Sequence, residues 1–310
     1  MRTKRRYWLW LVALPVALLA WQQKPAQEFV HLSDLHVTDL RQVAMTIRAS
    51  RMGNEGSSAR LAALLQRWRE GPRPEFAVVT GDLIDSYSYD NDAGEAVYGQ
   101  MDALRPLYES SPTPLFLLLG NHDVQRYRVL PGKTAPVGDQ SVSGDARAAW
   151  RKQFGCFRDG TYYAFTRKAG RRVYRFLMLD NGESAARNPE FVGQQAEWLQ
   201  RQLREHDGDS VIVAMHVPLQ DEGCSTWIRS ALARAGNVAL VLAGHRHTDG
   251  LEEVVLAEHR VLQVRTAGFT VNSANQRRIR LLEDQIEIYQ TGRPEELLRT
   301  VPAGSLVAVQ

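Results

Sequence analysis

Short apolar runs alternate with amphipathic segments along most of the chain. Six of these runs, at residues 29–33, 76–80, 114–119, 173–179, 210–215 and 238–243, are predicted to form strands, because short, nearly continuous apolar stretches are typical of strands buried on both faces of a sheet. Helices are predicted at residues 58–70, 95–109, 192–205 and 226–235, where apolar residues recur at helical spacing. Shorter strands are expected at residues 161–165, 261–266, 279–282 and 285–290, whereas residues 124–160 break the pattern and are expected to form an excursion over one face. The alternation predicts one α/β domain.

The composition is that of an ordinary globular protein, with 44% hydrophobic and 24% charged residues in a chain of 310. The net charge of +3 is unevenly distributed, because residues 1–26 contribute +5 and contain no acidic residue. Their basic residues are Arg2, Lys4, Arg5, Arg6 and Lys24. The rest of the chain therefore carries 3 − 5 = −2. A mildly acidic body gives no electrostatic reason to expect a nucleic-acid partner.

Residues 1–26 have the features of a leader. A basic stretch precedes a 15-residue apolar run at residues 7–21, which predicts either a cleaved export signal or an uncleaved membrane anchor. Ala20 would precede a cleavage site, whereas the tryptophans near both ends of the run are typical of an anchor. Because positive charge stays on the cytoplasmic side, both alternatives place a domain at residues 27–310 outside the cytoplasm, in the periplasm or the extracellular space. The membrane is a partner only if the leader is not cleaved.

The chain has two cysteines, Cys156 and Cys224. Two cysteines exclude a disulfide framework and a four-cysteine zinc site. In an oxidising compartment they either pair with each other or remain buried free thiols. Neither lies in a motif, so neither is assigned a catalytic role.

Polar residues that directly follow the apolar runs indicate where a ligand or a metal ion binds. They are Asp34 and His36 after the first run, Asp82 and Asp85 after the second, Asn121, His122 and Asp123 after the third, His216 after the fifth, and His245 and His247 after the sixth. Ligands bind outside the carboxyl ends of the strands in open α/β sheets, so we expect these side chains to meet at one edge. Each block alone has an ordinary structural interpretation, such as a helix cap or a polar turn. Together they predict a metal centre, since carboxylate, amide oxygen and imidazole suit Mn²⁺, Fe²⁺ or Zn²⁺.

In chain order, these blocks form the pattern D-x-H, G-D, G-N-H-[DE], a single His and G-H-x-H, between Asp34 and His247. The pattern resembles that of the calcineurin-like metallophosphoesterase family. The resemblance implies a four-layer αββα sandwich of two mixed β-sheets flanked by helices. It also implies two divalent metal ions at the strand ends.

Seven residues match the metal ligands of that family. One ion would be held by Asp34, His36, Asp82 and His247, and the other by Asp82, Asn121, His216 and His245, with Asp82 bridging the two. Such an ion pair clamps a phosphoryl group and lowers the pKa of a bridging water. The resemblance therefore implies in-line attack by a metal-bridging hydroxide on a phosphoester.

His122 holds no metal in this pattern. The matching histidine of the family donates a hydrogen bond to the phosphate or protonates the leaving oxygen, and a carboxylate partner would hold it cationic and oriented. Asp85 matches the family position that often supplies this carboxylate, and Asp123 is the neighbouring candidate. The alternative role of Asp85 is to cap a helix after the second strand.

Departures from the family pattern favour its bacterial phosphodiesterase branch. Purple acid phosphatases have a metal-binding tyrosine at the position of Asp85, and Ser/Thr protein phosphatases follow that position with Arg-Gly, where this chain has Ser86 and Tyr87. We therefore expect hydrolysis of a small phosphodiester substrate.

Two other functions remain open at this point. One is hydrolysis of a nucleotide-sugar or lipid pyrophosphate, and the other is a non-catalytic, metal-binding role in the cell envelope. His122 argues against the second, because a purely structural metal site has no use for it. Substrate choice is expected to depend on residues 86–94, residues 124–160 and the residues after His216.

Overall fold

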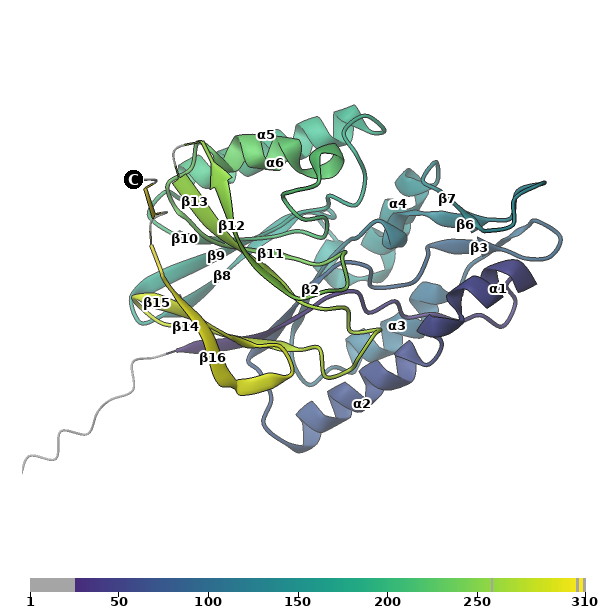
Figure 1. Cartoon of the computed structure of the whole chain (residues 1–310), viewed down its shortest axis with the longest axis horizontal. Coiled ribbons are helices and arrows are strands. Elements are labelled where there is room, and N and C mark those ends of the chain that lie inside the picture. The colour runs from purple at the N-terminus through teal and green to yellow at the C-terminus, as the bar shows by residue number, and fades with distance from the viewer. Residues whose placement is uncertain (1–25, 258, 305–306, 309–310) are drawn as a thin grey trace, which may run out of the picture.

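The computed structural model describes residues 26–257, 259–304 and 307–308, which build two large β-sheets and the helices around them (Figure 1). The first sheet has the strand order β16-β15-β14-β1-β2-β5. Its strands are β1 (Gln27–Leu32), β2 (Phe76–Thr80), β5 (Leu115–Leu118), β14 (Arg277–Leu281), β15 (Gln285–Gln290) and β16 (Arg293–Pro302). Strand β1 pairs in parallel with β2 and antiparallel with β14, so the sheet is mixed.

The second sheet has the order β12-β13-β11-β10-β9-β8. Its strands are β8 (Tyr163–Ala169), β9 (Arg172–Met178), β10 (Ser210–Ala214), β11 (Val238–Ala243), β12 (Gly250–Leu256) and β13 (His259–Arg265), and β17 (Val307–Ala308) pairs with β13. Strands β9, β10, β11 and β13 are parallel, whereas β8 and β12 are antiparallel to their neighbours. Both sheets are thus mixed, as expected.

The apolar faces of the two sheets form the central core. Phe29 of β1 stacks on Phe76 of β2 with ring centroids 4.9 Å apart, and both rings meet Phe176 of β9 edge-on. All three side chains are fully buried. Their burial explains why these strands read as continuous apolar runs, since each strand is covered on both faces.

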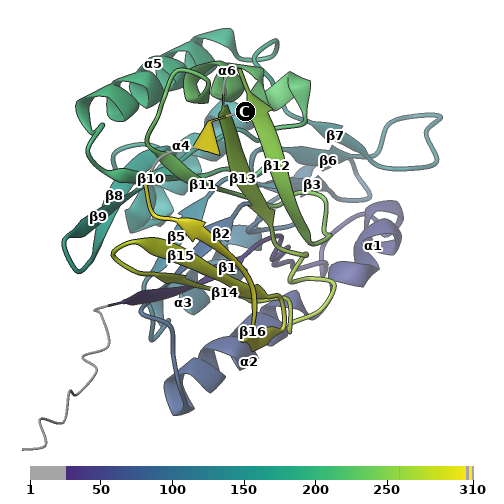
Figure 2. The same ribbon diagram turned by 60° about the vertical axis from the view of Figure 1, so that its left-hand side comes forward.

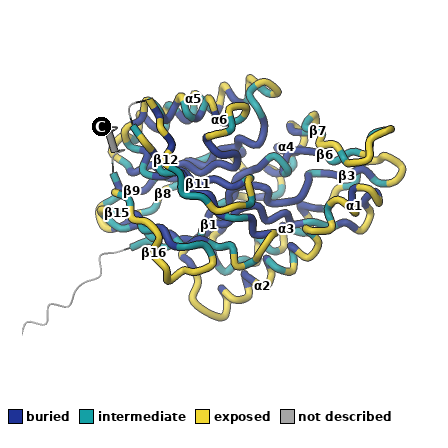
Figure 3. The backbone as a smooth tube through the Cα atoms, viewed as in Figure 1, coloured by how far each residue is buried: buried dark blue, intermediate teal, exposed yellow. Residues whose placement is uncertain are grey.

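Helices cover the outer faces of the sheets (Figures 1 and 2). The first sheet is covered by α2 (Ser57–Glu70) and α3 (Gln100–Glu109), and the second by α5 (Pro189–Glu205) and α6 (Glu222–Leu232). Helix α2 contributes Leu61 and Trp68 to one outer core, and α5 contributes Leu199 to the other. Figure 3 shows the consequence, with buried strands inside and exposed residues on the outer turns. The predicted four-layer αββα sandwich is therefore confirmed.

A smaller sheet lies at one end of the sandwich (Figure 1). It has the order β4-β3-β6-β7, formed by β4 (Ala96–Val97), β3 (Ser88–Asp90), β6 (Arg126–Arg128) and β7 (Val137–Asp139). Nearby lie α1 (Met45–Arg51), the 3₁₀ turn η1 (Met52–Asn54) and α4 (Ser143–Gln153). The expected helix at residues 95–109 starts only at Gln100, because β4 and Gly99, with φ of +124°, precede it.

The predicted leader lies outside the described residues except for Ala26. Among the helices that the structure describes, none combines the length and the apolar character that crossing a membrane requires. Cys156 and Cys224 are both free thiols and are only partly buried.

Candidate metal centre

The polar residues expected at the strand ends meet at one edge of the sandwich. Asp34, Asp82 and Asn121 follow β1, β2 and β5 of the first sheet, whereas His216 and His245 follow β10 and β11 of the second. The parallel orientation of these strands within each sheet brings their carboxyl ends together. The centre thus lies where the two sheets face each other.

One group of side chains that could hold a metal ion consists of Asp34, His36, Asp82 and His247. The Nε2 atoms of His36 and His247 lie 3.2 Å apart, and His36 Nε2 lies 3.5 Å from Asp82 Oδ2. Asp34 Oδ1 lies 3.3 Å from His247 Nε2 and is buried without a hydrogen bond of acceptable geometry among the described residues. Buried polar atoms require a partner. A cation between these four side chains would supply one, so the residues fit a metal ion.

A second group shares Asp82 with the first. His216 Nε2 lies 3.2 Å from Asp82 Oδ2 and 3.1 Å from Asn121 Oδ1. His245 Nδ1 lies 3.0 Å from the same Asn121 oxygen and 3.2 Å from His216 Nε2. The Asp82 carboxylate therefore faces both groups, as the bridging ligand of two ions must.

Further hydrogen bonds orient the histidines of the second group. His216 Nδ1 donates to the carbonyl of Thr80 at 2.8 Å, which turns Nε2 toward Asp82 and Asn121. The backbone N–H groups of His216 and Val217 both donate to Asn181 Oδ1, at 2.8 and 3.1 Å. Such second contacts fix the tautomer and ring orientation of metal-binding histidines. Asn181 was not singled out from the sequence, because an asparagine after a strand carries no distinctive signal.

The backbone at the centre is strained. Asp34, His36, Asp82, His245 and His247 all adopt positive φ angles, between 44° and 70°. Among the described non-glycine residues, only one other, Ala257, does so. Each such conformation costs about 1–3 kcal/mol and persists only where the surroundings enforce it, most often at functional sites.

The motif glycines allow the chain segments to approach closely. A Cβ at Gly81 would lie 2.6 Å from His216 Nδ1, one at Gly120 would lie 2.3 Å from Asp82 Oδ1, and one at Gly244 would lie 1.7 Å from Ser33 Oγ. No side chain fits at these distances. The glycines before Asp82, Asn121 and His245 are therefore required by packing at the centre itself.

The carboxylates and histidines of the centre shift one another's pKa values. Burial alone would lower the pKa of His216, but the adjacent Asp82 and Asp34 carboxylates raise it to about 9. Burial alone would likewise raise the pKa of Asp82, but His216 and His122 hold it well below its usual range. These contacts favour the ionised form of Asp82, which is the form that can bind a metal ion.

His122 lies beside both groups and hydrogen-bonds to neither of the two carboxylates expected to orient it. Its Nδ1 donates to the backbone carbonyl of Asp85 at 2.8 Å, whereas the Asp85 carboxylate is 4.0 Å away. The Asp123 carboxylate instead accepts backbone N–H groups of Leu83, Ile84 and Gly120. Burial lowers the pKa of His122 to about 4. The contact that holds the ring is therefore the Asp85 carbonyl, and a carboxylate that keeps His122 cationic stays a prediction.

The Asp85 carboxylate is hydrogen-bonded by residues other than His122. It accepts hydrogen bonds from His36, Arg51, Asn54 and Tyr89. Arg51 and Asn54 come from α1 and η1, which had no recognisable pattern in the sequence. Tyr89 belongs to the segment expected to select substrate, but its ring is fully buried, so it does not line the entrance.

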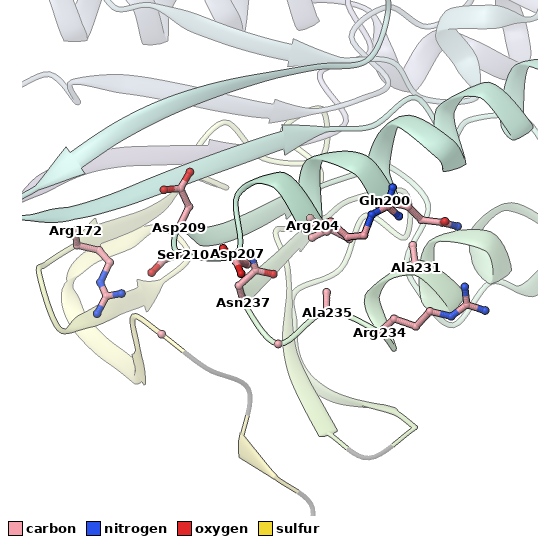
Figure 4. A pocket seen from close by; sticks show the side chains of 14 residues that line it. Arg172, Gln200, Arg204, Asp207, Asp209, Ser210, Ala231, Arg234, Ala235 and Asn237 are labelled. Carbon is pink, nitrogen blue, oxygen red and sulfur yellow. The ribbon is translucent and has the colours of Figure 1, made fainter.

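A separate cavity of about 470 Å³ lies far from this centre. Figure 4 shows Arg172, Arg204, Arg234 and Asp207 around it. Arg172 and Ser210 begin β9 and β10, so the cavity is at the amino ends of these strands, roughly 13–20 Å from their carboxyl ends. None of the predicted site residues lines it.

The fold and the donor set together define an α/β protein with a dinuclear site for divalent metal ions. The family model for calcineurin-like phosphoesterases matches residues 28–249, so the chain belongs to the calcineurin-like phosphoesterase family. The resemblance inferred from the motifs is thereby confirmed, and the protein is a metallophosphoesterase, a hydrolase of phosphoric ester bonds.

Solved structures share this fold. A dimetal phosphatase from Danio rerio superimposes with a TM-score of 0.57 at 15% identity, covering 92% of this chain and 98% of the other. GAP50, described as the anchor in the inner membrane complex of Plasmodium, superimposes with a TM-score of 0.56 at 15% identity, covering 93% and 90%. A comparison with curated proteins finds no relative that matches the sequence.

Proposed function

We propose that the protein hydrolyses small phosphodiesters at this centre. The observation that carries the proposal is the pair of ligand groups that share Asp82, one with Asp34, His36 and His247 and the other with His216 and His245. The motif departures that favour the phosphodiesterase branch supply the preference for a diester. The Danio rerio protein, described as a dimetal phosphatase, is consistent with phosphoester chemistry at such a site.

In this proposal, Asp34, His36, Asp82 and His247 hold one ion, and Asp82, Asn121, His216 and His245 hold the other. Two divalent ions, when bound, neutralise the charge of a phosphoryl group and activate a water. Mn²⁺, Fe²⁺ and Zn²⁺ all suit a donor set of carboxylate, amide and imidazole. The residues around the ions position the substrate and handle protons.

His122 is the proposed proton donor or phosphate contact. Its side chain is 15% exposed, and its Nε2 lies 3.9 Å from Asp82 Oδ2, on the side of the shared carboxylate. The Asp85 carbonyl fixes the ring through Nδ1. A phosphate beside Nε2 adds negative charge, which favours the protonated imidazole and allows it to donate there.

Turnover of a chromogenic diester tests the function. The chain from Gln27 onward is purified, stripped with chelator and assayed on bis(p-nitrophenyl) phosphate after addition of Mn²⁺, with p-nitrophenyl phosphate and a nucleotide-sugar diphosphate as competing substrates. Faster, metal-dependent cleavage of the diester supports the proposal. Preferential cleavage of the diphosphate would replace it with pyrophosphate hydrolysis.

The variant His122→Ala separates catalysis from a structural metal role. It should lose at least a hundredfold in turnover, since general acid–base catalysis contributes about 10²–10⁴-fold, while retaining both ions. His206→Ala is the control, because His206 directly follows α5 and precedes the amino end of β10, whereas the candidate centre lies at the carboxyl ends of the strands. Full activity in His122→Ala would contradict the assignment.

We also propose that residues 1–26 direct export or anchor the protein, which leaves the catalytic domain in the periplasm or outside the cell. The basic start and the apolar run of these residues support this. Fractionation of the expressing cell, with the mature N-terminus determined, distinguishes a cleaved signal from an anchor. A full-length protein in the cytosol would contradict both.

A further inference from the structure

The Asp85 carboxylate is a fully buried acceptor with an unusual number of donors. Arg51 Nε donates to Oδ2 at 2.8 Å, and Arg51 Nη2 contacts Oδ1. Asn54 Nδ2 and His36 Nδ1 reach Oδ1 at 2.6 and 3.0 Å, and the Tyr89 hydroxyl reaches Oδ2 at 2.5 Å. Arg51 is the only cation of fixed charge among these donors.

Arg51 is held in place by its own surroundings. It ends α1, a short helix whose Ile47 packs with Tyr89 in a small apolar cluster. Its guanidinium lies over the Tyr127 ring, 5.1 Å from the centroid, and its side chain is only 21% exposed. The neighbouring Asn54 also accepts a hydrogen bond from Thr270, which ties this segment to the loop after β13.

Asp85 connects this cation to the metal centre. Because His36 Nδ1 donates to Asp85 Oδ1, the ring is turned so that Nε2 faces Asp82 and His247, the other members of the ligand group. The backbone carbonyl of the same Asp85 holds His122. One residue therefore orients both a proposed metal ligand and the proposed proton donor.

We propose that Arg51 is a positioning residue for the ion site of Asp34, His36, Asp82 and His247. By clamping the Asp85 carboxylate with two N–H groups, it fixes the acceptor that aims His36 at the metal. A buried carboxylate that loses its cation must find other partners or turn toward water, and His36 would lose its orientation as a result. The inference rests on the proposed function only for the assignment of His36 as a metal ligand.

The experiment is a titration of the full-length protein with Mn²⁺. Binding is measured by calorimetry and by the electron paramagnetic resonance signal of free Mn²⁺. Loss of a contact that orients a metal ligand typically weakens metal affinity by about 10–100-fold. In Arg51→Met, the affinity for one of the two ions should fall by this factor, while the affinity for the other stays as in the wild type. Arg51→Lys should recover part of the loss, because it restores the charge but not the two-pronged contact.

Arg48→Met is the matched control. Arg48 lies one turn earlier on α1 and is half-exposed, and its ion pair among the described residues is with the exposed Glu55, at 3.8 Å. It should bind both ions with wild-type affinity. If Arg51→Met fails to fold, Tyr89→Phe serves as a second variant, because it removes one donor to Asp85 at nearly constant volume. It should lower the affinity for the same ion by a smaller factor.

The ion is identified with a double variant. His36→Ala should remove the same ion, so adding Arg51→Met to it should cause little further loss, since residues that act through one contact are not additive. Wild-type binding of both ions in Arg51→Met and Tyr89→Phe would overturn the proposal. So would additive losses in the double variant.

Kinetics distinguish positioning from direct substrate binding. With saturating Mn²⁺, Arg51→Met should lower kcat for bis(p-nitrophenyl) phosphate and leave KM near the wild-type value. A raised KM with unchanged metal binding would instead mean that Arg51 contacts the substrate, and this result would contradict the proposal. The titration needs no substrate. Weakened binding of one ion would therefore support the positioning role even if no phosphoester were hydrolysed.

Discussion

Gly244 illustrates how little space the candidate centre leaves at the scale of single residues. It lies between β11 and His245, and a Cβ there would also come within 2.9 Å of Asp34 Oδ2, a proposed metal ligand. The two sheets thus approach each other at the centre through a position that only glycine can occupy.

We predict that Gly244→Ala displaces Asp34 and reduces both bound metal and turnover by at least tenfold. Overpacking of this kind also costs about 1–3 kcal/mol of folding free energy. Two measurements test the prediction: the metal content, determined by atomic emission, and the thermal unfolding temperature. Gly236→Ala is the control, because a Cβ there meets no atom within 4 Å. Equal metal content in both variants would contradict the prediction.

His31 makes the stability of the protein depend on pH. Its ring is fully buried between two hydroxyls, with Nε2 at 2.9 Å from Thr80 Oγ1 and Nδ1 at 2.8 Å from Thr266 Oγ1. Burial, aided by the charge of Arg277, lowers its pKa from 6.5 to about 3. Between these values the unfolded chain binds a proton that the folded protein does not, so stability decreases as the pH falls below about 6.5.

We predict that His31 accounts for about 2 kcal/mol of lost stability at pH 5 relative to pH 7.5. Urea unfolding at the two pH values, for the wild type and for His31→Gln, measures this contribution. The variant should lose less stability on acidification than the wild type, because glutamine does not titrate. The same loss in both proteins would refute the prediction.

At the scale of elements, helix α4 shows how tertiary contacts stabilise a segment that the sequence left unassigned. Its Arg147 is buried and donates to Asp180 at 2.8 and 3.0 Å and to Glu183 at 2.8 Å. These two acids follow β9, near Asn181, which holds the backbone of His216. The helix is thereby tied to the edge of the second sheet.

We predict that Arg147→Met destabilises the protein by about 3–5 kcal/mol, because it leaves two buried carboxylates without their cation. Arg151→Met, one turn later on the exposed side of the same helix, should change stability by less than about 0.5 kcal/mol. Denaturant unfolding of the two variants provides the comparison. Similar midpoints would show that the ion pairs contribute little.

The elements predicted well are those whose own residues require burial. Strands β2, β11 and β15 match the expected ranges, because an apolar run or a regular alternation specifies them locally. The small sheet was not predicted, since its strands have only two or three residues and include charged side chains. Arg126 of β6 is held there by Asp90 of β3, at 2.7 Å, a contact that no local pattern reveals.

At the scale of the whole molecule, the candidate centre joins the two sheets. Asp34, Asp82 and Asn121 belong to the first sheet, and His216 and His245 to the second. An ion held by residues of both sheets would therefore stabilise the packing of one sheet on the other, in addition to any role in catalysis.

Removal of metal should accordingly lower the stability of the entire domain. At free metal a hundredfold above its Kd, each ion stabilises the folded state by about 2.7 kcal/mol. We predict a lower Tm after treatment with chelator and recovery after addition of Mn²⁺, measured by calorimetry at fixed protein concentration. Identical Tm values with and without metal would exclude tight binding at this centre.

The sequence by itself determined the alternation of strands and helices, the family and the set of residues that meet at the strand ends. It could do so because buried strands and motif residues are specified locally, and because parallel strands bring their carboxyl ends to one edge. The tertiary structure alone decided which partners these residues have. The Asp85 carboxylate is hydrogen-bonded by Arg51 and His36 and not by His122, because the packing of α1 on Tyr89 brings in a partly buried cation from 34 residues earlier in the chain. Such a contact depends on the path of the chain in space, which no local pattern of residues encodes.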